Sequence, residues 1–132
     1  MIVIDASVLA EALTGSGRAA EAAREALGGD PRWAGPSLLK TETLSVIRGR
    51  LLGKKITQET ADDAVTDLMA VVVDTVDENC LLPRIWELRG NLTAYDAAYV
   101  AAAEALGCSL VTMDARLSRA IGPRCPIQVV TS

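Results

Sequence analysis

Short runs of apolar, mostly β-branched residues alternate along this chain with longer segments of helical character, and this alternation limits the fold more than any other feature. The runs cover residues 2–4, 71–73, 109–112 and 127–130. They are almost uniformly apolar, so each predicts a strand that is buried on both faces. Buried strands separated by helices form a parallel sheet. The sequence therefore predicts an α/β fold, a three-layer α/β/α sandwich with a mainly parallel sheet.

The segments between these runs carry the start and stop signals of helices. We expect helices over residues 8–13, 18–27, 37–52, 58–70, 77–88, 94–106 and 114–121. Ser7, Thr57, Asp77 and Thr93 are placed to cap four of them. The segment between Asp30-Pro31 and Gly35-Pro36 is too short for more than an edge strand.

The chain has 132 residues, of which 50% are hydrophobic, and we expect residues 1–132 to form one domain. Asp5 stops the apolar start, no basic residue precedes it, and no stretch approaches the ~18 apolar residues of a membrane span. A soluble, cytoplasmic protein is therefore predicted. Its three cysteines, Cys80, Cys108 and Cys125, lie far apart, so we expect buried thiols in a reducing compartment.

The chain contains no histidine. This absence excludes Ser-His-Asp and Cys-His catalysis and the usual histidine-containing zinc sites. The absence of phenylalanine, with only two Trp and two Tyr, also argues against aromatic platforms for unpaired bases. Acid-base or metal chemistry in this chain must therefore depend on carboxylates.

Four of the 17 acidic residues stand where water should be scarce. Asp5 ends the first strand and Asp114 follows the strand at 109–112, so both belong to the carboxyl edge of the sheet, where open α/β folds bind ligands. Glu42 and Asp96 interrupt the apolar faces of their helices. Taken singly, each has an ordinary explanation as a cap or an ion-pair member. Together they predict one acidic pocket at that edge.

A pocket of carboxylates needs a counterion. Two carboxylates ~4 Å apart repel each other by ~4 kcal/mol at an effective dielectric constant near 20. Oxygen ligands without histidine or paired cysteine select a hard ion, Mg²⁺ or Mn²⁺. Such an ion lowers the pKa of a bound water and stabilises charge on a phosphate during in-line displacement.

Four blocks of the sequence resemble those of PIN-domain ribonucleases, and most closely those of VapC-type toxins from bacterial toxin-antitoxin pairs. The blocks are MIVIDAS at 1–7, SLLKTE at 37–42, LTAYDAAYVAAA at 92–103 and LVTMDARL at 110–117. They occur in the family's order and span nearly the whole chain. The resemblance implies a PIN-like fold, with Asp5, Glu42, Asp96 and Asp114 as the catalytic, metal-binding acids.

The resemblance also assigns supporting roles to two hydroxyl residues. Ser7 and Thr112 match family positions that would orient the carboxylates or a water, although a plain helix cap explains Ser7 equally well. Many relatives carry a further acid soon after the position of Asp114, whereas Ala115 and Arg116 follow here. The missing acid removes one potential ligand, so the resemblance does not imply that a second metal ion is held firmly.

The basic residues are clustered, although the net charge is −4. One cluster lies at 48–55, and Arg116, Arg119 and Arg124 follow the last aspartate without an intervening acid. Arg116 is the best candidate for RNA contact, because phosphate binding needs only a local positive patch. The resemblance further implies a homodimer, an antitoxin partner that can place a basic side chain in the pocket, and structured RNA such as tRNA or rRNA as the substrate.

The expected activity is that of a Mg²⁺- or Mn²⁺-dependent endoribonuclease that leaves a 5′-phosphate and a 3′-hydroxyl. Two alternatives stay open at this point. One is another magnesium-dependent phosphate enzyme, a phosphoaspartyl phosphohydrolase or a receiver-like domain, although Ser7 stands where the former has a second aspartate and Lys55 is the last lysine. The other is a catalytically silent binding module on the same scaffold.

Overall fold

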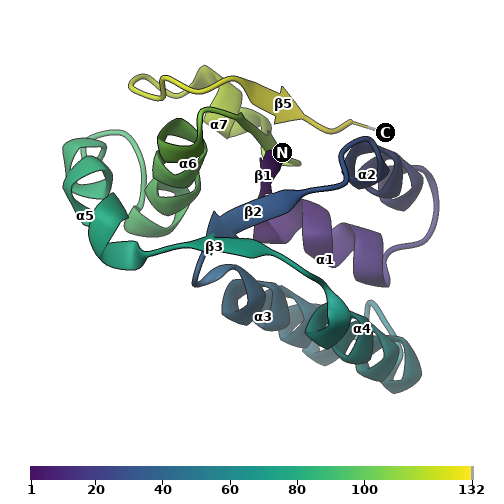
Figure 1. Ribbon diagram of the computed structural model, residues 1–132. Coiled ribbons are helices and arrows are strands. Elements are labelled where there is room, and N and C mark those ends of the chain that lie inside the picture. The colour runs from purple at the N-terminus through teal and green to yellow at the C-terminus, as the bar shows by residue number, and fades with distance from the viewer. Residues whose placement is uncertain (132) are drawn as a thin grey trace.

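The computed structural model describes residues 1–131, and its five short strands pair into one sheet with the order β3-β2-β1-β4-β5 (Figure 1). All neighbouring strands are parallel. The strands are β1 (Ile2–Ile4), β2 (Trp33–Pro36), β3 (Asp74–Val76), β4 (Ser109–Thr112) and β5 (Ile127–Val129). The helices are α1 (Ala6–Thr14), α2 (Arg18–Gly28), α3 (Leu39–Leu52), α4 (Gln58–Ala70), α5 (Glu78–Glu87), α6 (Ala94–Leu106) and α7 (Ala115–Arg119).

The helices form two layers around this sheet. Helix α6 packs on β1, β2 and β4 and carries α5 beside it, whereas α1 packs on the other face together with α2, α3 and α4. Figure 1 shows the two groups of helices on opposite sides of the strands. The predicted three-layer sandwich with a parallel sheet is therefore confirmed. None of the helices within residues 1–131 has the length and apolar character needed to cross a membrane.

Helix α6 is the most deeply buried helix, because its side chains are mostly small. Seven consecutive residues, 97–103, are buried, and five of them are alanine. A helix that is apolar on all sides lies inside a protein rather than on its surface. The first turn of α6, which carries Asp96, is consequently held in a fixed place at the end of the sheet.

The register of the two central strands places distant residues next to each other. Ile4 of β1 pairs with Val111 of β4, and the amide of Asp5 donates to the carbonyl of Val111 at 3.2 Å. Asp5 and Thr112, which each follow one of these paired residues, therefore meet at the carboxyl edge of the sheet.

Two strand predictions are wrong. Residues 71–73 form no strand; Val72 is 85% exposed, and the carbonyl of Val71, the C-cap of α4, accepts a hydrogen bond from Lys40 Nζ at 2.7 Å. Pairing with β2 begins only at Asp74, so Asp74 starts a strand instead of ending one. Strand β2 was expected at an edge, yet it lies between β1 and β3, and the edge strands are β3 and β5.

Helix limits agree within a few residues, but some local predictions fail. Thr57 and Thr93 cap α4 and α6 as expected, whereas Asp77 precedes α5 without a capping bond from its side chain. The cysteines are not the buried residues we expected: Cys80 is exposed, and Cys108 and Cys125 are half-buried free thiols.

Leu110 provides a test of the central strand. Leu110 is fully buried in β4, so Leu110→Ala leaves a cavity and should lower the free energy of unfolding by about 2 to 5 kcal/mol. Val72→Ala removes exposed methyl groups and should change it by no more than about 0.5 kcal/mol. Urea unfolding followed by circular dichroism measures both values, and equal effects would contradict the described core.

Candidate acidic active site

Asp5 lies at the centre of the carboxyl edge and is almost fully buried, with 7% of its surface exposed. Its Oδ1 atom accepts hydrogen bonds from Ser7 Oγ at 2.6 Å and from the amide of Val8 at 3.2 Å. The hydroxyl of Thr112 donates to the other oxygen, Oδ2. Burial raises the pKa of Asp5 despite these hydrogen bonds. The carboxylate is thus firmly oriented, yet its charge is unfavourable without a cation.

The hydrogen bonds of Ser7 differ from those of the predicted helix cap. Asp5 itself is the N-cap of α1, and Ser7 lies inside the first turn of that helix, so its expected role as the cap is wrong. Ser7 Oγ instead donates to Asp5 and accepts from the amide of Met113 at 3.0 Å. Thr112 Oγ1 likewise accepts from the amide of Asp114 at 3.0 Å. Both hydroxyls therefore connect the end of β1 to the loop after β4.

Glu42 lies in the first turn of α3 and is half-buried. The hydroxyl of Tyr99 donates to Glu42 Oε1 at 2.7 Å. Burial raises the pKa of Glu42, and the negative charges of Asp96 and Asp5 raise it further, while the hydrogen bond from Tyr99 opposes the shift. Glu42 therefore lies within electrostatic reach of two other predicted site acids.

Asp96 lies in the first turn of α6, directly above the capping residue Thr93, whose hydroxyl accepts from the Asp96 amide at 3.2 Å. Burial raises the pKa of Asp96, and the charge of Asp114 raises it further. The guanidinium of Arg116 acts in the opposite direction. Asp96 thus connects the Glu42 side of the pocket to the Asp114 side.

Asp114 differs from the other three acids because it has a cationic partner. It is the N-cap of α7, and Arg116 binds both of its oxygens, through Nε at 3.1 Å and Nη2 at 2.8 Å. These hydrogen bonds hold the pKa of Asp114 below its usual range. Arg116, which we expected to contact RNA, is therefore occupied by a neighbouring carboxylate in this structure.

The four acids influence one another electrostatically in pairs: Asp5 with Glu42, Glu42 with Asp96, and Asp96 with Asp114. Within residues 1–131, however, no three carboxylates lie close enough together to hold an ion among themselves. The ion pair with Arg116 occupies Asp114 on one side of the group. The predicted acids thus share one region of the surface, but they do not form a closed cage.

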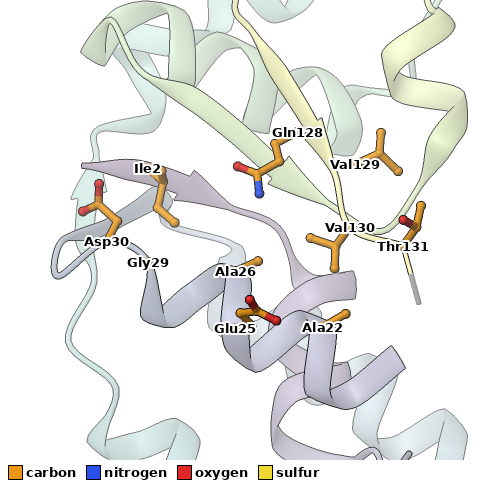
Figure 2. Close-up of a pocket in the computed structure, with 10 residues that line it drawn as sticks. All are labelled: Ile2, Ala22, Glu25, Ala26, Gly29, Asp30, Gln128, Val129, Val130 and Thr131. Atoms are coloured by element: carbon orange, nitrogen blue, oxygen red, sulfur yellow. The ribbon is translucent and has the colours of Figure 1, made fainter. Parts of the chain in front are cut away.

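Two hollows border the acids. One, of about 310 Å³, is lined by Asp96, Asp114 and Arg116, and the other, of about 360 Å³, is lined by Glu42 and Tyr95. A larger cavity of about 480 Å³ lies between α2 and the β5 edge of the sheet, and Figure 2 shows that none of the four acids lines it. Two of the hollows therefore flank the acidic group itself.

Tyr99 was missed by the sequence analysis. It was included in the alanine-rich helix, and its hydroxyl received no role. The available signal was a tyrosine three residues after Asp96, on nearly the same helical face, within a stretch of alanines. A buried phenol requires a hydrogen-bond partner, and that partner is Glu42.

Known proteins match the chain along nearly its whole length. The PIN-domain family model matches residues 2–122. The chain is 39% identical to VapC ribonuclease Mb0985 of Mycobacterium bovis over 130 residues, or 98% of each chain. It is 37% identical to ribonuclease VapC1 of Mycobacterium tuberculosis, over 97% of this chain and 96% of that one.

Solved structures share the fold at much lower sequence identity. VapC20 of Mycobacterium tuberculosis superposes with a TM-score of 0.70 at 17% identity, covering 90% of this chain and 94% of the other. VapBC2 from Rickettsia felis superposes with a TM-score of 0.68 at 16% identity, covering 99% and 100%. These likenesses concern the fold alone, whereas the family model and the more similar relatives concern the sequence. The chain therefore belongs to the PIN-domain family and is of the VapC type.

Proposed function

We propose that the chain is the toxin of a toxin-antitoxin pair, a metal-dependent endoribonuclease that cleaves structured RNA at the acidic group. The observation that carries the proposal is the position of four acids around the carboxyl edge of the sheet, two as the N-caps of α1 and α7 and two in the first turns of α3 and α6. Burial raises the pKa of Asp5, Glu42 and Asp96, and acids perturbed in this way are candidates for a functional site. The family membership supports the reaction class, because relatives that are 39% and 37% identical to the chain are named ribonucleases.

The residues fit a hard divalent cation. The donors are carboxylate and hydroxyl oxygens, and the chain has no histidine to favour a softer ion. A divalent cation would also relieve the mutual repulsion of Glu42 with Asp5 and Asp96. PIN-domain ribonucleases are generally dependent on a divalent metal, and we propose Mg²⁺ or Mn²⁺ for this chain.

Carboxylates from among Asp5, Glu42, Asp96 and Asp114 would hold the ion. Mg²⁺ commonly keeps several waters and uses only one or two carboxylates, so a closed cage of protein ligands is not required. When bound, such an ion supplies an activated water and positive charge beside the scissile phosphodiester. The roles of these four residues are proposals that rest on their position.

The protein's own side chains contribute orientation. Ser7 and Thr112 donate hydrogen bonds to the two oxygens of the Asp5 carboxylate. These bonds fix the orientation of the carboxylate, so it would not rotate when a cation binds. Arg116 can exchange Asp114 for a phosphate oxygen, because its side chain is 81% exposed. A guanidinium released in this way would place positive charge beside the bound RNA.

The partners are proposed from the family. VapC20, which shares the fold, is described as a toxin that cleaves the sarcin-ricin loop, and we propose a structured RNA of this general kind as the substrate. An antitoxin partner is supported by the similarity to VapBC2. The homodimer and the cytoplasmic location remain predictions. Family membership removes the support for a phosphoaspartyl enzyme. A silent binding module is tested by the RNA cleavage assay of the wild type and Asp96→Asn.

Asp96→Asn tests the nuclease. The substitution removes one of the central charges and keeps the size of the side chain, so we expect Mn²⁺-dependent cleavage of total bacterial RNA to fall by at least about 100-fold. Asp63→Asn alters an exposed acid on α4 and should have no effect. Mapping of new 5′ ends should reveal 5′-phosphates.

Two results would contradict this proposal. Equal cleavage by both variants would remove the activity from this site. A wild-type protein that binds its partner but cleaves no RNA with either metal ion would support a silent binding module instead.

Glu42→Gln tests whether the ionised Glu42 side chain destabilises the metal-free fold. Because the pKa of Glu42 is raised in the folded state, its ionisation destabilises the metal-free fold as the pH rises above the ordinary glutamate value of 4.5. Glutamine removes the charge but keeps an oxygen acceptor for Tyr99. We expect the variant to have the higher Tm at pH 7 without divalent ions and to match the wild type near pH 4, as measured by differential scanning calorimetry. A lower Tm at pH 7 would contradict the unfavourable ionisation that burial and the neighbouring carboxylates impose on Glu42.

A further inference from the structure

We infer that Tyr99 is the positioning residue of Glu42, and that its hydroxyl holds one glutamate oxygen so that the other faces the acidic pocket. The inference deepens the proposed function and rests on it, because it assumes that the pocket binds a divalent cation. Nothing in the sequence motifs alone assigns a role to this hydroxyl.

The geometry is specific. Tyr99 is 1% exposed, and its hydroxyl lies 2.7 Å from Glu42 Oε1. Tyr99 belongs to α6 and Glu42 to α3, helices on opposite sides of the sheet. The hydrogen bond therefore passes beyond the carboxyl ends of the strands, where Asp5 also lies.

The same hydrogen bond opposes the effects that disfavour the ionised form of Glu42. Those effects are burial and, after it, the charges of Asp96 and Asp5. The hydroxyl of Tyr99 keeps Oε1 engaged and leaves Oε2 available. Burial and the nearby carboxylates raise the pKa of Tyr99 far above its ordinary value of 10.0, so the phenol keeps its proton and remains a donor.

Helix α6 thereby supplies two groups to the pocket from consecutive turns. Asp96 contributes charge, and Tyr99, three residues later, orients the acid of another helix. A purely structural role, in which Glu42 only satisfies a buried phenol, would give the same hydrogen bond. The test must therefore measure metal binding as well as stability.

The two tyrosines of the chain provide a matched pair of variants. Tyr99→Phe removes the buried hydroxyl and keeps the ring, and Tyr95→Phe removes an exposed one on the same helix. We expect Tyr99→Phe to raise the Kd for Mn²⁺, measured from free Mn²⁺ by electron paramagnetic resonance, by about 10-fold. RNA cleavage should recover at high Mn²⁺ concentration. Tyr95 lines the hollow beside Glu42, so Tyr95→Phe controls for metal binding alone and should leave the Kd for Mn²⁺ unchanged.

A second measurement does not depend on the folding of Tyr99→Phe. In Tyr95→Phe protein labelled with 3-fluorotyrosine, Tyr99 is the single fluorinated residue, and its ¹⁹F resonance should move when Mg²⁺ is added. The movement should disappear when Glu42→Gln is also present. Unchanged Mn²⁺ affinity in folded Tyr99→Phe, or a resonance that ignores Mg²⁺, would overturn the inference.

Failure of this inference is distinguishable from failure of the proposed function. If Glu42→Gln and Asp96→Asn weaken Mn²⁺ binding while Tyr99→Phe does not, only the role of Tyr99 is wrong. If none of the three variants changes Mn²⁺ binding, the pocket does not hold the cation, and both proposals fail.

Discussion

The burial of neighbouring carboxylates at one edge of a parallel sheet is the physical constraint that defines this site. Asp5, Glu42 and Asp96 all have raised pKa values, because burial and, for two of them, neighbouring negative charge disfavour ionisation. Only Asp114 has a cationic partner, Arg116, and its pKa is lowered. The fold keeps these carboxylates buried and close together, as is typical of residues that serve binding or catalysis.

The surrounding elements reduce the repulsion without removing it. All four acids lie at helix N-termini: Asp5 and Asp114 are N-caps, and Glu42 and Asp96 lie in first turns. The positive end of the helix dipole favours negative charge at such positions by about 0.3 to 1 kcal/mol each. Hydrogen bonds from Ser7, Thr112 and Tyr99 add to this effect. A bound cation would offset the larger part of the repulsion that remains.

The sequence predicted the elements whose signals are local. Strand β4 and helix α6 have the expected limits, because a buried apolar run and a Thr cap with a final Gly act within a few residues. The run at 71–73 failed because a strand also requires a neighbour, and pairing with β2 begins only at Asp74. Where β2 sits in the sheet depends on tertiary packing, which local pattern does not contain.

The sequence named the four acids of the candidate site, but it did not predict which side chains contact them. The four acids were identified from strand ends, helical faces and the family resemblance, and their electrostatic coupling agrees with a shared location. The hydrogen bond between Tyr99 and Glu42 joins residues 57 positions apart, which no local pattern encodes. The pairing of Arg116 with Asp114 was also missed, although the two residues lie only two positions apart. It was missed because Arg116 was considered only as a contact for RNA.

The four acids are tested together most directly by a titration of their carboxyl carbons by ¹³C NMR, with and without saturating Mg²⁺. Without the ion, we expect pKa values above the ordinary range for Asp5, Glu42 and Asp96, and below it for Asp114. With the ion, the three raised values should fall together. Ordinary pKa values for these three residues that do not respond to Mg²⁺ would contradict the claim that the acids form one cation-binding unit.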